Sequence, residues 1–148
     1  MSLQEEISAA LQDGMRAKDE TKLASLRLVL TAIKTKEKEI RRSLKDPEVI
    51  AVVSSQIKQR RESIDQYRKA GRQDLADAEE REIQVLQVFM PEQLSEEEMS
   101  RAVDEVIAEV GAASIKDMGK VMKATMAKLA GRADGRAINA MVKAKLSG

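Results

Sequence analysis

Apolar residues recur at three- and four-residue steps along most of this chain, and this spacing predicts amphipathic helices rather than strands. The first part of the chain carries four such patterns, at about residues 2–17, 19–44, 46–71 and 74–89. The second and third patterns are long and are joined by about three residues, so these two helices should fold back as an antiparallel pair. We therefore expect residues 1–91 to form an elongated helical scaffold, with the shorter helices packed alongside.

Local signals refine the ends and inward faces of these helices. Asp46 is expected to cap the third helix, and Pro47 to be its first helical residue. The second helix is expected to continue to about Leu44, and Gly71 to end the third helix. Four-residue spacing gives the first helix its inward positions, which are Leu3, Ile7, Leu11 and Met15.

Residues 92–148 predict a small three-helix module. Its first helix begins at Ser95, which can form a capping box with Glu98, and ends at Gly111. The second opens at Ser114, and Asp134 can cap the third. The second helix is expected to bury Ile115, Met118, Met122, Met126 and Leu129. The third is expected to bury Ile138, Met141, Val142 and Leu146. The methionines could also form an adaptable partner groove, but their place on the apolar faces favours core filling.

Composition supports the all-α fold class and narrows the class of protein. The 148 residues include two Pro, seven Gly, one Tyr and one Phe, with few strand-forming residues in alternation. Cys is absent, which excludes disulfides and thiolate chemistry. The N-terminus lacks the features of a signal peptide, and no apolar run approaches the ~20 residues of a membrane span. We therefore expect a cytoplasmic protein with no membrane association.

Charge is segregated in the C-terminal module although the whole chain carries only +1. Residues 92–110 hold one Arg and seven acidic residues, a net charge of −6, whereas residues 111–148 hold eight Lys or Arg and two Asp, a net charge of +6. A basic block on two consecutive helices can present several donors to phosphates, with counterion release driving the binding. The alternative is that these lysines are solvated helix faces, as most charged helical positions are.

Basic residues also recur in residues 1–91, but 17 basic side chains there face 16 acidic ones. Pairing between residues four apart and simple solvation are expected to account for most of these cations. The Arg60-Arg61 pair and the turn from Arg68 to Arg72 stay secondary candidates for contacts with a nucleic-acid backbone.

Catalysis by this chain alone is not expected. The absence of His and Cys excludes a His general base, a Cys-His pair and a zinc finger. The acidic clusters at residues 96–98 and 79–82 fit a helix start and a solvated helix face better than a catalytic or metal site. Gly119 lies in a helical pattern without the spacing of a phosphate-binding loop, and it is expected to allow close approach of a helix or ligand. We expect no cofactor and no metal.

Residues 119–146, GKVMKATMAKLAGRADGRAINAMVKAKL, resemble the C-terminal tail of the GatB/YqeY family. LRLVLTAIKTKEKEI, QRRESIDQYRKAGRQDLADAEEREI and MPEQLSEEE extend the likeness to stand-alone YqeY proteins over nearly the whole chain. The resemblance implies an all-helical protein whose tail is shared with the B subunit of the tRNA-dependent amidotransferase, where the tail domain binds tRNA. In that enzyme the amidase lies in a different subunit. The segment Ala127-Lys128-Leu129-Ala130 departs from the amidotransferase tail, and so does the absence of the catalytic cradle before it.

The function hypothesis is therefore a non-catalytic accessory protein that binds tRNA or a similar structured RNA, linked to amidotransferase function. Asn139 is a candidate for sugar or base-edge contact, and Gly119 for close approach of the ligand. The phosphate-contact candidates are Lys116, Lys120, Lys123, Lys128, Arg132, Arg136 and Lys143. The competing hypothesis is a helical adaptor that binds protein partners through residues 92–110 or the N-terminal helices and has no RNA-binding role.

Overall fold

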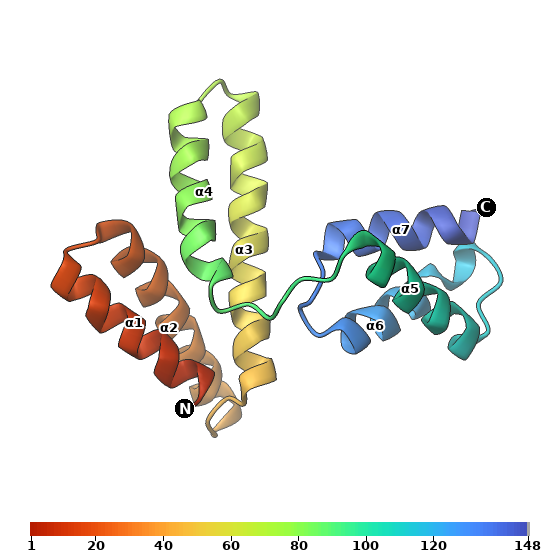
Figure 1. Ribbon diagram of the computed structural model, residues 1–148, viewed down its shortest axis with the longest axis horizontal. Coiled ribbons are helices and arrows are strands. Elements are labelled where there is room, and N and C mark those ends of the chain that lie inside the picture. The colour runs from red at the N-terminus through yellow and green to blue at the C-terminus, as the bar shows by residue number, and fades with distance from the viewer. Residues whose placement is uncertain (148) are drawn as a thin grey trace. The chain divides into compact units, whose positions relative to one another are not determined.

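The computed structural model describes residues 1–147, and within them the chain forms helices and no strand (Figure 1). The prediction of an all-α fold is therefore confirmed. The α-helices are α1 (Leu3–Ala17), α2 (Glu20–Ile40), α3 (Asp46–Lys69), α4 (Gln73–Gln87), α5 (Glu96–Val110), α6 (Met118–Leu129) and α7 (Gly135–Ser147), and the 3-10 helix η1 (Ile115–Asp117) precedes α6.

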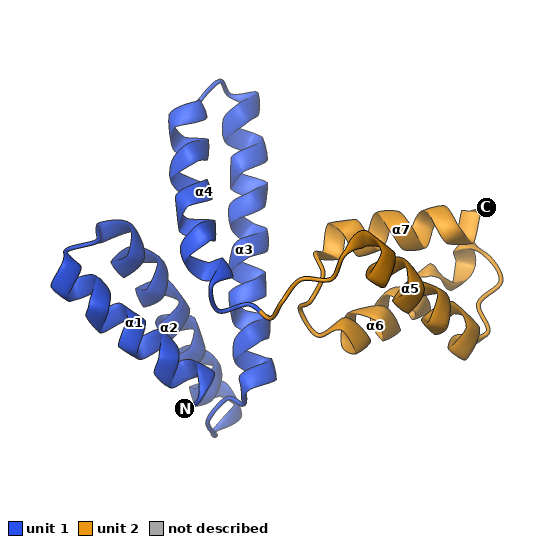
Figure 2. Cartoon of the chain, viewed as in Figure 1, with its two compact units in different colours: residues 1–90 blue, residues 91–148 orange. Residues whose placement is uncertain are grey.

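The chain divides into two compact units, Met1–Met90 and Pro91–Gly148 (Figure 2). The first unit contains α1 to α4, and the second contains η1 and α5 to α7. Each unit has its own cluster of buried apolar side chains. That residues 1–91 and 92–148 are separate domains stays a prediction.

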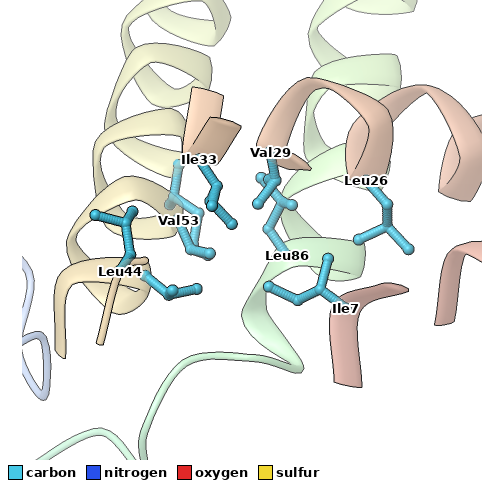
Figure 3. Packing of buried hydrophobic residues seen from close by; sticks show 9 residues of the cluster. Ile7, Leu26, Val29, Ile33, Leu44, Val53 and Leu86 are labelled. Carbon is cyan, nitrogen blue, oxygen red and sulfur yellow. The ribbon is translucent and has the colours of Figure 1, made fainter. Parts of the chain in front are cut away.

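In the first unit, α1 pairs with α2 and α3 pairs with α4 (Figure 1). The expected long antiparallel pair of α2 and α3 is not the main packing of this unit. These two helices diverge from their connecting loop, and each pairs mainly with its shorter neighbour. The reason is that α1 and α4 must bury apolar faces too: Ile7 and Leu86 lie among the α2 and α3 residues of one core (Figure 3).

The second helix ends earlier than predicted, at Ile40 rather than near Leu44. Arg41 adopts a left-handed backbone with a φ of 57° and breaks the helix there. Glu37 Oε2 then accepts a hydrogen bond of 2.9 Å from the backbone N–H of Leu44. This bond turns the loop back, so Leu44 is buried in the core from a loop position.

Asp46 does not cap α3 as predicted, because Lys45 is the N-cap residue and Asp46 is the first residue of the helix. The Asp46 Oδ1 atom accepts a hydrogen bond of 3.0 Å from the backbone N–H of Leu3. Its carboxylate therefore satisfies a free N–H group at the start of α1, a helix more than forty residues away in sequence.

The predicted caps at Ser95, Gly111 and Asp134 in the second unit are confirmed, whereas the predicted role of Ser114 differs. Ser95 Oγ accepts the backbone N–H of Glu98, and Glu98 Oε1 accepts the backbone N–H of Ser95, both at 3.2 Å. Gly111 ends α5 in the left-handed conformation with a φ of 66°. Ser114 caps the short η1 rather than α6 itself. Asp134 Oδ1 accepts the backbone N–H of Arg136 at 3.2 Å in the first turn of α7.

The predicted inward residues Leu3, Ile7 and Leu11 of α1 and Met118, Met122 and Leu129 of α6 pack in the two cores, but both faces differ from the prediction at single positions. In α1, Gly14 is buried, whereas Met15 is 49% exposed. In α6, Val121 and Thr125 are fully buried, whereas the predicted core residue Met126 is 46% exposed. Ile115 is likewise 44% exposed, because η1 has three residues per turn and breaks the α-helical register. The prediction that Met118, Met122, Met126 and Met141 fill the core was wrong for Met126.

No helix in the described part of the chain combines the length and the apolar character needed to cross a membrane.

Candidate nucleic-acid interface

The acidic and basic halves of the second unit lie on different helices of one small bundle. The acidic residues 92–110 include all of α5, and the basic residues 111–148 include η1, α6 and α7. Both α6 and α7 pack against α5 and against each other. Opposite charges are therefore close enough to pair across the bundle, and pairing decides which cations remain available to a ligand.

Two lysines are bound by carboxylates of α5. Lys128 Nζ lies 2.7 Å from Glu105 Oε2 and 3.4 Å from Glu109 Oε1. The hydrogen bond that Lys128 donates to Glu105 is the main reason why the pKa of Lys128 is raised. Lys145 Nζ lies 2.8 Å from Asp104 Oδ1. Lys128, one of the predicted phosphate contacts, thus has its charge already compensated within the bundle.

Two further candidates hold backbone segments in place. Lys120 Nζ donates to the carbonyl oxygen of Val110, in the last turn of α5, at 3.3 Å. A cation suits this negative end of a helix. Arg132 Nε donates to the carbonyl oxygen of Glu92 at 3.3 Å, and Arg132 O accepts the backbone N–H of Leu94 at 2.8 Å. Lys120 and Arg132 therefore have structural partners, although both residues are exposed.

Three lysines remain with exposed charges. Lys116, Lys123 and Lys143 are exposed, and none of them forms an ion pair with a residue that the structure describes. Arg136 and Asn139 are also exposed, on α7. Lys116, Lys123 and Lys143 can therefore meet a ligand without first breaking a carboxylate pair.

Helical spacing places the α6 and α7 residues of this set opposite the lysines that contact α5. In α6, Gly119, Lys123 and Met126 are three and four positions apart and form one exposed stripe. Lys128, which contacts α5, lies on the other flank of the same helix. In α7, Arg136, Asn139 and Lys143 likewise share an exposed face. The helices α6 and α7 pack against each other, and η1 packs against both. We group the exposed residues of the two stripes with the exposed Lys116 of η1 and call them the α6–α7 surface: Lys116, Gly119, Lys123, Arg136, Asn139 and Lys143.

Gly119 leaves space on this surface. A Cβ atom added at Gly119 would meet nothing within 4 Å. The glycine is therefore not needed for close packing of a neighbouring helix, which was one of its two expected roles. The other expected role, close approach of a ligand backbone, stays a prediction.

Arg60 and two of the acidic residues singled out above are held by internal contacts. Arg60, predicted as a secondary backbone contact, is 7% exposed and pairs with Glu82 at 3.2 Å, so it is not available to a ligand. Burial and the neighbouring Glu82 raise the pKa of Glu79. Glu98 serves the α5 capping box, and the backbone N–H of Ser95 lowers its pKa. No group of three or more acidic side chains in the described residues is arranged to hold a metal ion.

The arginines at the α3–α4 turn are also paired. Arg68 Nη2 lies 2.8 Å from Glu80 Oε1, and Arg72 Nη2 lies 3.0 Å from Asp74 Oδ2. The hydrogen bonds between Arg72 and Asp74 lower the pKa of Asp74 and raise the pKa of Arg72. A ligand phosphate would compete with a carboxylate at each position.

Comparison with known proteins adds an independent line of observation. A family model described as "Yqey-like protein" matches residues 4–146. An uncharacterized protein of Schizosaccharomyces pombe is 36% identical over 94 residues, which cover 64% of this chain and 76% of that protein. The "altered inheritance of mitochondria protein 41, mitochondrial" of Eremothecium gossypii is 41% identical over 81 residues, or 54% of this chain and 44% of that protein.

One similar protein belongs to a named enzymatic assembly. It is a glutamyl-tRNA(Gln) amidotransferase component from Thermococcus gammatolerans, and it is 42% identical over 57 residues. The match covers 36% of this chain but only 9% of that protein. It therefore concerns a small shared segment within a much larger protein.

Proposed function

Because the chain belongs to the YqeY-like family, we propose that it is an accessory protein that binds tRNA or a similar structured RNA through the α6–α7 surface. The protein contributes RNA binding and no catalysis of its own. The proposed role is linked to the tRNA-dependent amidotransferase reaction, in which glutamine donates an amide group.

The observation that carries this proposal is the unequal pairing of the lysines in the second unit. The α5 carboxylates bind Lys128 and Lys145, at 2.7 Å and 2.8 Å. Lys116, Lys123 and Lys143 are exposed and form no ion pair with a described residue. A set of solvated lysines scattered over a bundle would not require these three lysines to lack carboxylate partners. A phosphate-binding face would.

The relative from Thermococcus gammatolerans supports tRNA as the class of RNA. Its name concerns glutamyl-tRNA(Gln), and the shared segment is small compared with the whole of that protein. A segment that is present both in such a large protein and in a small one fits a binding module better than a catalytic core. This support is for a tRNA-binding segment and not for amidotransferase activity.

The composition of the second unit predicts how the RNA is recognised. The aromatic residues of the chain are Tyr67 and Phe89, and both precede residue 91. Stacking on unpaired bases is therefore not a source of affinity in this unit. Lysine contacts to phosphates and an Asn139 contact to sugar or base edges remain. We expect salt-sensitive binding to a folded RNA backbone with weak sequence specificity.

We propose a cytoplasmic location as part of the same function. A cytoplasmic location fits an accessory factor that meets free tRNA. Several relatives carry the word mitochondrial in their names, and that word describes those proteins. The chain spans about three quarters of the length of the first relative and less than half of the length of the next two.

The test compares binding to total cellular tRNA and to duplex DNA across a salt series. The variant carries Lys116→Glu, Lys123→Glu and Lys143→Glu. The matched control carries Lys58→Glu, Lys69→Glu and Arg81→Glu, which change the net charge by the same amount at exposed positions of the first unit. We expect preferential binding of tRNA. We also expect the logarithmic salt slope of the α6–α7 variant to fall by about 2 to 3, at about 0.7 to 0.9 for each lost phosphate contact.

Two results would contradict the proposal. One is equal and negligible binding of wild type to tRNA and DNA, which would favour the helical adaptor with a protein partner on the N-terminal helices. The other is a salt slope that falls equally in the variant and in the control, because it would show a response to total charge rather than to this surface. Circular dichroism of each variant checks that helicity is unchanged.

A further inference from the structure

A second row of unpaired cations lies on α2, in the first unit. Arg27, Lys34 and Lys38 are all exposed. Together with Thr31 and Arg41 they follow the steps four, three, four and three, which is the spacing of one face of an α-helix. Arg27 and Lys38 are eleven residues apart, so the row is about 16 Å long at 1.5 Å per residue. We call Arg27, Thr31, Lys34 and Lys38 the α2 stripe.

The α2 stripe does not follow the expectation that carboxylates pair the cations of residues 1–91. None of its three cations forms an ion pair with any residue in the described part of the chain. Glu37 lies three positions after Lys34, but its carboxylate accepts the backbone N–H of Leu44 at 2.9 Å. In the other direction, Glu20 lies in the first turn of α2, about 10 Å before Arg27. The α2 stripe is therefore a local concentration of positive charge in a unit that is close to neutral.

The exposed face of α3 provides the contrast. Lys58, Glu62, Asp65 and Lys69 have the same helical spacing and the same exposure. Two carboxylates separate the two lysines there, as expected for an ordinary solvated face. On α2 the two corresponding positions are Thr31 and Lys34, so no carboxylate lies between Arg27 and Lys38 on this face. The α2 face therefore carries three cations and no carboxylate, whereas the α3 face carries two cations and two carboxylates.

We propose that the α2 stripe is a second binding surface for the phosphate backbone of RNA, separate from the α6–α7 surface. Three cations within about 16 Å can contact successive phosphates along one strand. The exposed Thr31 adds a hydroxyl group that can donate to a phosphate oxygen between them. The choice of RNA as the ligand rests on the proposed function, whereas the α2 stripe does not depend on the α6–α7 surface.

An anionic lipid surface fits the α2 stripe less well. A helix that binds in a membrane interface needs an apolar face directed toward the acyl chains. The apolar face of α2 is already used, because Leu26, Val29 and Ile33 are fully buried in the core of the first unit. The α2 stripe itself contains no apolar residue. It can offer charge and hydroxyl groups, which are what a phosphate backbone requires.

The two surfaces should contribute together if they bind one RNA molecule. Each surface then raises the effective concentration of the other at the RNA. Loss of the α2 stripe is expected to lower the affinity for tRNA by about tenfold to a hundredfold at 0.1 M salt, with the logarithmic salt slope falling by about 2 to 3.

The experiment uses the full chain and total cellular tRNA across a salt series. The α2 variant carries Arg27→Glu, Lys34→Glu and Lys38→Glu, and a second form of it carries Gln at the same positions to limit any change in helix stability. The matched control is the Lys58→Glu, Lys69→Glu and Arg81→Glu variant. We expect both α2 variants to lose affinity and salt slope, and the control to keep most of both.

The outcomes separate this inference from the proposed function. Binding that falls in the α6–α7 variant, while the α2 variants behave like the control, overturns the α2 stripe and leaves the proposed function intact. Binding that falls only in the α2 variants overturns the proposed role of the α6–α7 surface and supports the α2 stripe. A wild-type protein that binds no tRNA overturns both. Binding to phosphatidylserine vesicles that is lost in the α2 variants, without binding to tRNA, assigns the stripe to lipid instead.

Discussion

Replacing Arg60 should destabilise the first unit far more than replacing an arginine on its surface. The Arg60 side chain is 8% exposed and its Nε atom lies 3.2 Å from Glu82 Oε2. Its Nη1 atom also donates to the carbonyl oxygen of Gln56 at 3.3 Å. The Arg60→Ala variant removes both contacts and leaves the Glu82 carboxylate without its cation.

The size of the effect follows from burial. Breaking a fully buried ion pair costs about 3 to 5 kcal/mol, whereas an exposed pair contributes about 0.2 to 1 kcal/mol. The side chain of Glu82 is 27% exposed, so water can partly solvate the carboxylate that is left. We therefore expect Arg60→Ala to lower the free energy of unfolding by about 2 kcal/mol. For a unit of this size, that corresponds to a fall in Tm of roughly 10 °C.

The assay is urea and thermal unfolding followed by circular dichroism, with Arg68→Ala as the matched control. Arg68 pairs with Glu80 at 2.8 Å, but the two side chains are 50% and 48% exposed. The control should therefore lose no more than about 0.5 kcal/mol. Equal losses in the two variants would refute the reasoning, because burial would then not determine the strength of these pairs.

Three further predictions concern packing, capping and pH. Leu86→Ala should lower the free energy of unfolding by about 3 kcal/mol in urea titrations, because Leu86 is fully buried in the first core. Ser95→Ala should cost about 1 kcal/mol in the same assay, because it removes the cap of α5; Ser95→Thr, which keeps the hydroxyl, is its control, and an equal loss in both would contradict a capping role. The pKa of Glu48 is lowered from 4.5 to about 2, mainly by its hydrogen bond with Arg42. A carboxyl group whose pKa is lowered by folding stabilises the folded state at pH values above its ordinary pKa. This contribution should therefore be lost as the pH falls from about 5 to about 2. Arg42→Ala should weaken this dependence of Tm on pH, and an unchanged pH profile would contradict the assignment.

Much of the fold was predictable because its signals act within one helical turn. The α5 cap needs only Ser95 and Glu98, three residues apart, and its end needs only Gly111. Apolar periodicity indicated the helices and the all-α class in the same way. The Asp46 prediction was wrong because the role of this residue is set by a partner that is distant in the sequence. Asp46 bonds with Leu3, across 43 residues, and no local pattern indicates that contact.

Which cations can meet a ligand depended on the tertiary structure. In sequence, Lys123 and Lys128 are two similar lysines of one basic helix. Folding brings Glu105 and Glu109 against Lys128 and leaves Lys123 exposed. Arg60 looks like its neighbours in the sequence, yet packing buries it beside Glu82.

The sequence by itself determined the helices, most of their ends and the separation of charge in the second unit. Only the tertiary structure decided which charges are paired, which are buried and which faces are free. The physical reason is the distance along the chain over which each kind of interaction acts. Capping and helical periodicity act over one or two turns of the chain. An ion pair needs two side chains within about 4 Å in space, and only the packing of helices distant in sequence sets that separation.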